Sequence, residues 1–327
     1  YYAPNIDINN RVKLLRKHFY KVAKKEKGIF KTYNGIALAQ NRQELKKELE
    51  FAKSIGETTD GKKIYLYANA ADNVLIKEIG RLREISFRQV KEGSGKQRDI
   101  DDFDYCYEHI ILWDEKDLEI VGSYRIVKSS EMIEAYGVDG LYTSTLYRYE
   151  KEFDKYFSNS IELGRSFIQP RYWNSRALDY LWQGIGAYLR ANPDIRYMFG
   201  CVSISASYSE DAIALLVYFY TNYFGSKIKS VKHRDSYIML ESKKRKFDEL
   251  FFKNDYAKDM IILKHELSIM GYAIPTLYKQ YSELCDEGGV EFIDFGVDKG
   301  FENCVDGFII VDTNKLKLQK RRRYLEN

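Results

Sequence analysis

Residues 160–170 read SIELGRSFIQP and carry the most informative pattern of the chain. Their β-branched and apolar residues predict a strand over 160–168. Side chains alternate along a regular strand, so Glu162 and Arg165 would point to opposite faces. Gly164 between them is where a β-bulge would lie, and one extra residue would return both charged groups to the same face. We therefore expect a bent strand that carries a glutamate and an arginine, either as a structural ion pair or as part of a site beside a cleft.

A second strand is predicted over 119–128, where the run VGSYRIV surrounds Arg125 with apolar residues. A buried guanidinium needs an anionic partner, which could be Glu162 or a substrate carboxylate. An acidic cluster precedes the neighbouring strand at 105–114. Its members and the histidine that follows are Asp101, Asp102, Asp104 and His109. Such a cluster fits either a solvated turn or a site for an amino group.

Working outward, the pattern alternates between strands and helices without a strict βαβ rhythm. Further strands are predicted over 63–68, 198–205, 290–295 and 307–311, and helices over 75–90, 176–190, 211–224 and 256–270. The segments at 105–114 and 119–128 form a hairpin across a short acidic turn. This order favours an α/β fold with a mixed sheet and helices on both faces.

Charge is distributed unevenly along the 327 residues. The net charge is +4, but residues 1–50 hold twelve Lys and Arg against five acids, which leaves −3 for the rest. A second basic run lies at 315–323. We interpret residues 1–58 as a basic helical arm and 59–327 as the folded domain. Two basic ends predict a negatively charged partner, such as phospholipid headgroups, an acidic protein or nucleic acid.

Several classes of site are not supported by the sequence. The four cysteines form no CxxC pair and the four histidines no HExxH, so neither a zinc site nor a disulfide framework is expected. The GSGK run at 93–96 lacks the spacing of a phosphate-binding loop. No window reaches about 18 uninterrupted apolar residues, as a membrane-spanning helix would require. Nucleic acid is disfavoured because the body is acidic and the basic runs are not interleaved with stacking aromatics.

Taken together, seven runs resemble one family. They are RLREISFR (81–88), DIDDFDYCYEHIILWD (99–114), VGSYRIV (121–127), IELGRSFIQPRYW (161–173), LWQGIGAYL (181–189), FGCVSIS (199–205) and FENCVDGFIIVD (301–312). In this order they resemble the ornithine N-acyltransferase (OlsB-type, haemolysin-like) branch of the GNAT acyltransferases, which is related to the acyl-homoserine lactone synthases. The resemblance covers about residues 60–312 and implies a GNAT-like, mostly antiparallel central sheet with helices on both faces.

The resemblance also implies a reaction. The family transfers a 3-hydroxyacyl chain from acyl carrier protein to the α-amine of an amino acid, ornithine being the usual acceptor, and forms a lyso-aminolipid. Family members are often joined to an upstream lysophospholipid acyltransferase domain. The chain begins at Tyr1, so we expect its basic arm to be the tail of such a domain.

One departure concerns the acyl donor. The family's glycine-rich pyrophosphate loop would lie at residues 169–176, which contain no glycine. Acyl-phosphopantetheine carried by acyl carrier protein is therefore expected as donor in preference to acyl-CoA, with no bound cofactor. Backbone N–H groups at the start of the following helix would bind its phosphate. The side chains expected beside it are Arg171, Asn174, Ser175 and Arg176.

Thioester aminolysis needs a neutral amine, and Glu162 is the candidate base because burial would raise its pKa. Strand N–H groups freed by a bulge at Gly164 would stabilise the oxyanion. Arg125 or Arg165 would bind the acceptor carboxylate. The residues expected to line the acceptor site are Arg81, Asp102, Asp104, His109 and Ser166.

Two alternatives remain at this stage. The acceptor could be glycine or another amine, because the pocket that selects it is not visible in the sequence. The domain could also be a non-catalytic module that docks a carrier protein or a membrane. The expected location is the cytoplasm, with peripheral association at an anionic inner-membrane surface through the basic ends.

Overall fold

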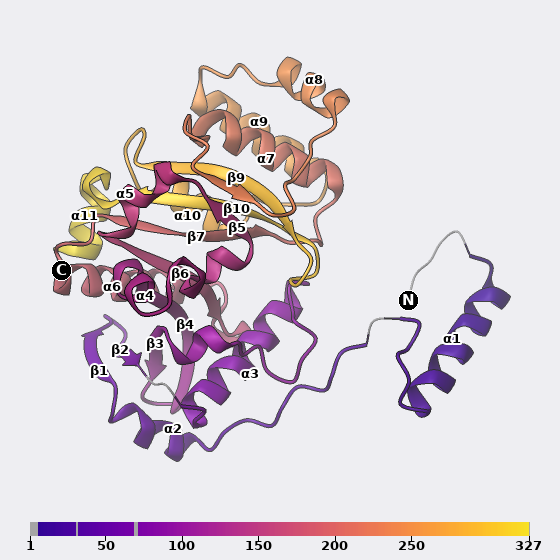
Figure 1. Cartoon of the computed structure of the whole chain (residues 1–327), viewed down its shortest axis with the longest axis horizontal. Helices are drawn as coiled ribbons and strands as arrows, with labels where there is room; N and C mark the ends of the chain where they lie inside the picture. The colour runs from indigo at the N-terminus through magenta and orange to yellow at the C-terminus, as the bar shows by residue number, and fades with distance from the viewer. Residues whose placement is uncertain (1–5, 31, 69–70, 327) are drawn as a thin grey trace.

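A single eight-stranded sheet forms the centre of the molecule (Figure 1). The computed structural model describes residues 6–30, 32–68 and 71–326. The strand order is β1-β2-β3-β4-β6-β7-β10-β9. The strands are β1 (Lys53–Glu57), β2 (Lys63–Ala68), β3 (Glu108–Asp114), β4 (Glu119–Lys128), β6 (Ser160–Ile168), β7 (Tyr197–Ile204), β9 (Val290–Asp298) and β10 (Cys304–Asp312). All neighbours are antiparallel except β6 and β7, which are parallel.

The parallel pair at the middle of the sheet is incomplete. β6 and β7 are in register only from Ser160 opposite Tyr197 to Leu163 opposite Gly200. Beyond this point β6 remains paired with β4, and β7 with β10, but not with each other. A Cβ on Gly200 would lie 2.1 Å from the carbonyl oxygen of Leu163, so only glycine allows the last close contact before the strands separate.

A β-bulge in β6 lies just after this point. Ser123 of β4 is opposite Phe167 and Arg125 is opposite Gly164, so two residues of β6, Arg165 and Ser166, face one residue of β4. Arg165 itself has a φ of 51°, the left-handed conformation. The sequence predicted the bulge at Gly164. It lies one residue later, because the positive φ is taken by the arginine, which is held by buried carboxylates described below.

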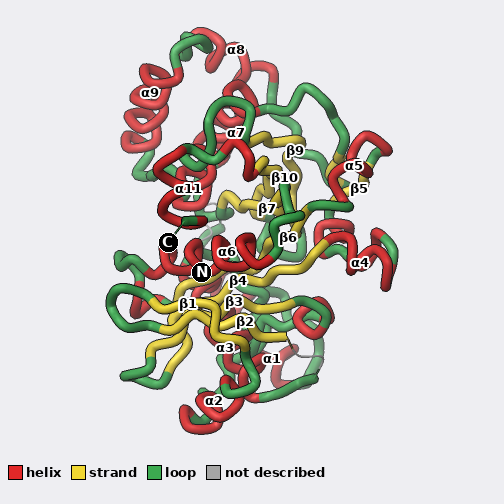
Figure 2. Tube along the Cα trace, turned by 90° about the vertical axis from the view of Figure 1, so that its left-hand side faces the viewer, coloured by secondary structure: helices red, strands yellow, loops and turns green. Residues whose placement is uncertain are grey.

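Helices cover both faces of the sheet (Figure 2). α3 (Val74–Gln89) and α4 (Ser129–Tyr136) pack on one face, and α6 (Ala177–Ala191) packs across β1 to β4 on the other. α7 (Glu210–Phe224) packs beside β9 on the same side as α6, within one continuous core. A Cβ on Gly184 of α6 would lie 2.6 Å from Ile110, so this glycine allows α6 to approach the sheet closely.

The predicted GNAT-like fold, a mixed and mostly antiparallel sheet with helices on both faces, is confirmed. Among the remaining helices, α9 (Tyr256–Ile269) was predicted over 256–270. The others were not predicted; they are α5 (Asp154–Phe157), α8 (Glu241–Leu250), α10 (Thr276–Ser282) and α11 (Leu318–Leu325). A small second sheet joins β5 (Tyr147–Tyr149) to β8 (Val231–His233).

The N-terminal region divides in two. α1 (Ile8–Ala23) lies apart from the body in Figure 1, whereas α2 (Arg42–Leu49) packs on α3 through buried Leu45 and Leu49. β1 then forms the edge of the central sheet. The predicted boundary at residue 58 therefore falls after the first strand of the sheet. That the arm continues from an upstream domain stays a prediction.

Candidate active site

The separation of β6 from β7 opens an inner pocket of ≈ 100 Å³ in the middle of the sheet. Its wall combines backbone of β6 with side chains of β7, β10 and the loop after α3. Polar groups that line it belong to Glu92, Tyr142, Arg165, Ser203, Asp298 and Asp306. On the open side, β6 has no strand partner after Leu163 in the described part of the chain. Backbone N–H groups of this half of β6 therefore lack a sheet acceptor on the pocket side.

A larger pocket of ≈ 510 Å³ adjoins the inner one. The two share Phe87, Glu92, Ser166 and Leu277 in their walls. The larger pocket extends toward the start of α6, and its apolar side chains include those of Val90, Phe167, Ile168, Trp173 and Leu178. The pair forms one cleft, apolar along its outer part and charged at its inner end.

Carboxyl groups dominate the inner end. Asp306 of β10 is 3% exposed, and burial together with the nearby charge of Asp298 raises its pKa to about 6. Burial, reinforced by Asp306, raises the pKa of Glu92 to about 8. Among the described residues no hydrogen bond or ion pair holds the Glu92 carboxylate. Asp298, by contrast, accepts hydrogen bonds from the backbone N–H groups of Gly300 and Phe301, at 2.7 and 3.1 Å.

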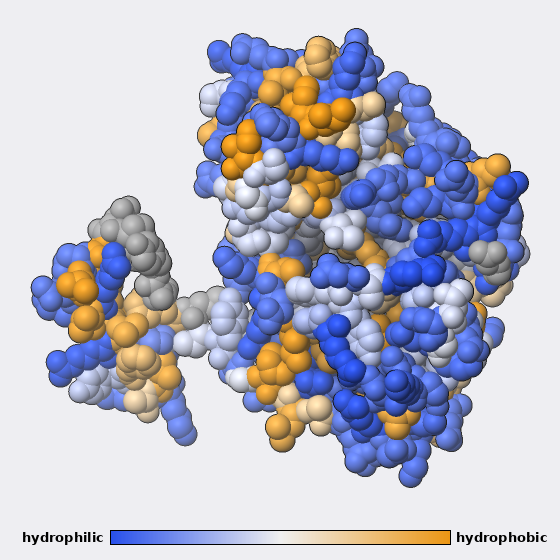
Figure 3. All heavy atoms as spheres, turned by 180° about the vertical axis from the view of Figure 1, so that it is seen from behind, coloured by the Kyte–Doolittle hydropathy of each residue, from blue (hydrophilic) through white to orange (hydrophobic). Residues whose placement is uncertain are grey.

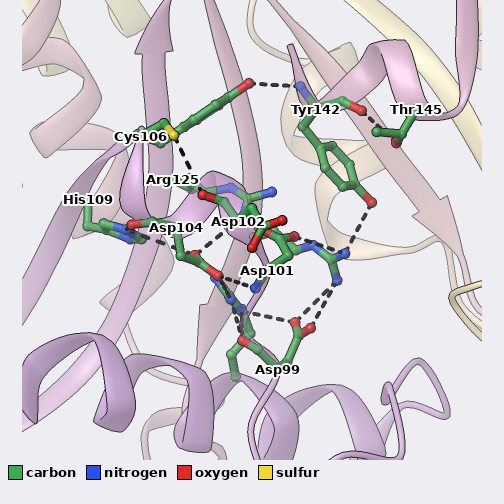
Figure 4. Close-up of polar contacts among 12 residues, drawn as sticks. Asp99, Asp101, Asp102, Asp104, Cys106, His109, Arg125, Tyr142 and Thr145 are labelled. Carbon is green, nitrogen blue, oxygen red and sulfur yellow. Dashed lines mark hydrogen bonds and ion pairs between the residues drawn. The ribbon is translucent and has the colours of Figure 1, made fainter. Parts of the chain in front are cut away.

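Asp99, Asp101, Asp104 and Arg125 belong to an ion cluster (Figure 4), which Arg165 also contacts. Arg83 of α3 is 1% exposed and contacts Asp99 at 2.9 Å and Asp104 at 2.6 Å. Burial alone would raise the pKa of Asp104, but the charges of Arg83 and Arg125 outweigh it and hold that pKa well below its usual range. The cluster is thus a set of charged groups that satisfy one another.

Arg125 and Arg165 join this cluster from the two central strands. Arg125 Nη1 contacts Asp101 at 2.5 Å and Asp104 at 3.3 Å. Arg165 contacts Asp99 at 3.2 Å and donates to the Tyr142 hydroxyl at 3.2 Å. The Tyr142 ring lies 5.1 Å from both guanidinium carbons, which places it between two cations.

Each of these two arginines keeps one buried N–H without a partner among the described residues, Nη2 of Arg125 and Nε of Arg165. Only Arg165 also lines the inner pocket. Arg165 therefore brings a positive charge to the wall of the space where the acidic groups gather.

Comparisons with known proteins agree with this architecture. Residues 82–183 match the family described as acetyltransferase (GNAT) domain. The glycine Nα-acyltransferase of Phocaeicola vulgatus is 30% identical over 300 residues, covering 88% of this chain and 91% of the relative. The chain belongs to the amino-acid Nα-acyltransferase branch of the GNAT acyltransferases. The resemblance found in the sequence is thereby confirmed, and the protein is an acyltransferase rather than a non-catalytic module.

The chain is also similar to an L-ornithine Nα-acyltransferase and to one solved structure. The L-ornithine Nα-acyltransferase of Rhodobacter capsulatus is 26% identical over 273 residues, covering 78% of this chain and 92% of the relative. The solved structure of the acyl-homoserine lactone synthase LasI aligns with a TM-score of 0.38 at 11% identity, covering 83% of this chain and 97% of that one.

Glu162 of this GNAT Nα-acyltransferase lies outside both pockets. Its carboxylate accepts hydrogen bonds from the Tyr107 hydroxyl, the Tyr142 N–H at 3.0 Å and the Thr143 N–H at 2.7 Å. Burial raises its pKa, as predicted, but hydrogen bonds from Thr143 and Tyr107 oppose that rise. The group thus anchors the 142–143 turn. No ion pair with Arg165 or Arg125 is found in the described chain, which corrects that expectation.

Other predicted acceptor residues are engaged in the structure. Burial lowers the pKa of His109 to about 4, so the ring is neutral, and its Nε2 lies 3.0 Å from the Asp104 carbonyl. Asp104 belongs to the ion cluster, Asp102 is exposed outside it, and Arg81 pairs with Glu78 at 2.6 Å. Of the predicted acceptor-site residues, Ser166 alone lines the pockets.

The four residues expected to bind the acyl donor fall into two pairs. Asn174 and Ser175 line the larger pocket, and the Ser175 hydroxyl accepts from the Ala177 N–H at 3.1 Å at the start of α6. Arg171 and Arg176 are both more than half exposed and do not line it. Arg171 pairs with Asp117 and with Glu119 at 2.6 Å, and Arg176 lies 3.6 Å from Asp179.

Glu92 and Asp306 were missed by the sequence reasoning. Glu92 directly precedes the GSGK run at 93–96, in a polar loop where an acidic residue is ordinary. Asp306 lies inside the predicted strand segment FENCVDGFIIVD, where an acid between apolar residues was the available signal. The cleft also contains Cys201, but burial raises the pKa of this thiol well above its usual value, so it does not supply a thiolate nucleophile.

Proposed function

We propose that this Nα-acyltransferase moves a long acyl chain from a thioester directly to the α-amine of glycine. The single observation that carries the proposal is the cleft itself, apolar along its outer pocket and narrow, charged and open to unpaired strand backbone at its inner end. The name of the Phocaeicola vulgatus relative, similar along almost the whole chain, supports glycine over the ornithine expected from the sequence. An inner space of ≈ 100 Å³ also suits a small acceptor.

The outer pocket fits the pantetheine arm and the start of the acyl chain. Its apolar side chains contact methylene groups, and Asn174 and Ser175 offer polar contacts near the first turn of α6. The glycine-free loop at 169–176 favours acyl carrier protein over coenzyme A as donor. Exposed Arg171 and Arg176 lie beside this pocket, where an acidic carrier protein would bring its prosthetic group.

The reaction is aminolysis of the thioester. The amine nitrogen forms a bond to the carbonyl carbon, whose oxygen becomes an oxyanion, and the carbon–sulfur bond then breaks. We assign the proton acceptor to the Glu92 carboxylate, which lines both pockets and makes no hydrogen bond or ion pair within the part of the chain that the structure describes. Glu92 takes one proton from the attacking nitrogen and can return it to the departing thiolate.

We assign stabilisation of the oxyanion to the half of β6 that has separated from β7. N–H groups of this half that are not bonded to β4 lack a strand partner on the pocket side, and each well-placed donor contributes ~3 kcal/mol to the transition state. The Arg165 guanidinium, which lines the inner pocket, is our candidate for binding the acceptor carboxylate. Tyr142 and Asp99 hold the rest of that guanidinium in place.

Ornithine is the second candidate. Asp298 and Asp306 both line the inner pocket, and a carboxylate pair of this kind would bind a side-chain ammonium. The two acceptors differ in a testable way, because removal of the Asp298 charge would weaken binding of ornithine and leave glycine unaffected.

The test is acyl transfer from 3-hydroxyacyl-carrier protein and from the matching acyl-CoA to a panel of free amino acids, with mass detection of the product. We expect N-acylglycine, formed faster from the carrier protein. N-acylornithine as the main product would select the second candidate. If the folded protein forms no N-acyl amino acid from either donor, the proposal is contradicted.

A further inference from the structure

The α1 helix belongs to the basic arm and has no role in the proposed reaction. Its helix begins at Asp7, whose side chain accepts from the N–H groups of Asn9 and Asn10 at 3.0 and 3.1 Å. Four turns follow without a single acidic residue, while Arg11, Lys13, Arg16, Lys17 and Lys21 are basic. The helix therefore has a charge of one sign along its whole length.

Apolar side chains form a stripe along this helix. They follow the spacing i, i+4, i+7, i+11 and i+14, which keeps them on one face of an α-helix. The five are Ile8, Val12, Leu15, Phe19 and Val22, with exposed fractions of 74, 61, 42, 61 and 43%. Figure 3 shows hydrophobic residues among hydrophilic ones on the surface of this segment.

The end of the helix has a defined structure. His18 is buried, and its Nδ1 accepts from the N–H groups of Ile29 and Phe30 at 3.1 Å each. A Cβ on Gly28 would lie 2.6 Å from this ring, so glycine permits the turn that brings the chain back against α1. The turn covers the His18 side of α1 and leaves the apolar stripe exposed.

We propose that α1 is a membrane-binding helix that lies in the headgroup region of an anionic bilayer. An exposed apolar stripe with a lysine- and arginine-rich polar face is the pattern of helices that lie in the plane of the interface. Charge complementarity selects anionic lipid. An acidic carrier protein would satisfy the lysines but leaves a stripe of about four helical turns without an apolar partner. The inference does not depend on which amino acid the enzyme acylates.

The experiment is co-sedimentation of the full chain with vesicles, without substrate. One set is pure phosphatidylcholine and the other contains about 30% phosphatidylglycerol. We expect binding to the anionic vesicles, weakened several-fold when salt is raised from about 0.1 to 0.5 M. The variant Val12→Ser with Phe19→Ser should lower the partition coefficient about tenfold or more, because two exposed apolar side chains would be lost from the stripe.

The matched control is Ile238→Ser with Phe252→Ser. These residues are 84 and 62% exposed on the body, so the same chemical change is made away from α1. The control should bind like the wild type, and both double variants should keep wild-type acyl transfer to a soluble donor. Three results would overturn the proposal: the α1 variant binds vesicles as well as the wild type, only the control loses binding, or the wild type does not bind at all. A fourth would be a wild-type chain that forms dimers but does not bind vesicles, together with an α1 variant that stays monomeric. The apolar stripe would then bind a second copy of the chain.

Discussion

Two groups of carboxylates lie on either side of Arg165 and behave in opposite ways. Asp99, Asp101 and Asp104 face two buried arginines, Arg83 and Arg125, and the partly buried Arg165; the charges of Arg165 and Arg83 outweigh burial to lower the pKa of Asp99. Glu92 and Asp306 face the cleft without an ion pair to any of the described residues, and burial raises both pKa values. The comparison teaches that burial of an acid does not by itself mark a catalytic group. The charged groups in contact with a buried carboxylate determine whether it stabilises the fold or is available to exchange a proton.

Removal of one charge from the paired group should have the largest effect. Asp104→Asn leaves Arg83 and Arg125 buried with less than their full counter-charge. We expect the free energy of unfolding, measured by urea denaturation, to fall by about 3–5 kcal/mol. The neighbouring Asp102→Asn is the control, because Asp102 is exposed and outside the ion pairs. A loss below about 1 kcal/mol for Asp104→Asn would contradict the structural role of the cluster.

The same kind of change in the unpaired group should affect catalysis instead. Glu92→Gln keeps the shape but removes the proton acceptor, so kcat should fall about 10²- to 10⁴-fold. The free energy of unfolding should not decrease, because no ion pair is broken. Glu134→Gln, an exposed glutamate on α4, should keep wild-type kcat. A Glu92→Gln enzyme with near wild-type kcat would remove Glu92 from the mechanism.

The pH dependence of activity sharpens this assignment. Glu92 must be ionised to accept a proton, and its pKa is raised to about 8. We therefore expect kcat/KM, expressed per concentration of neutral amine, to rise up to about pH 8 and then level off. In Glu92→Gln this rise should be absent. An identical profile in the variant would assign the rise to another group.

Stability should respond to pH in opposite directions for the two groups. The pKa of Asp306 is higher in the folded than in the unfolded state, so the folded state keeps this proton to a higher pH. Asp306 therefore lowers the free energy of unfolding as pH rises from about 4 to 6. The lowered pKa of Asp99 works the other way, with stability present above pH 4 and lost as pH falls further. Between about pH 4 and 6 the free energy of unfolding, measured with urea, should therefore fall by roughly 1–3 kcal/mol less in Asp306→Asn than in the wild type. An unchanged pH slope would contradict the burial of a titrating Asp306.

The smallest effect is expected at the surface. Arg171 is exposed and pairs with Asp117 and Glu119. Arg171→Gln should change the free energy of unfolding by less than about 1 kcal/mol. If the residue guides an acidic carrier protein, KM for acyl-carrier protein should rise severalfold while KM for acyl-CoA stays constant. Equal changes for both donors would argue against carrier docking at this position.

The sequence predicted the order of elements because strand and helix periodicities are local. The segments over 63–68 and 160–168 were predicted with the bounds that β2 and β6 have, and α6 begins one residue later than predicted. The position of the bulge was not predictable, because the positive φ of Arg165 depends on Asp99 and Tyr142, distant in the chain. Burial of Glu162 was anticipated, but not the turn at 142–143 that satisfies its carboxylate.

The site was only partly predictable for the same reason. Arg165 and Ser166, both expected at the site, line the cleft. Glu92 and Asp306 come together only because β7 leaves β6 after Gly200 and the loop after α3 covers the gap. No local pattern encodes that separation. In addition, no helix in the described ranges is both long and apolar enough to cross a membrane.

The most direct test of the central claim fills the pocket that opens where β6 and β7 separate. Gly164 lines it, and a Cβ there would meet nothing within 4 Å. Gly35 is equally open on the surface of the linker and serves as control. Gly164→Leu should keep the wild-type melting temperature but lose acyl transfer by about 100-fold or more, since the side chain would occupy the space of the reacting groups. Gly35→Leu should be fully active. Wild-type acyl transfer by folded Gly164→Leu would contradict the account.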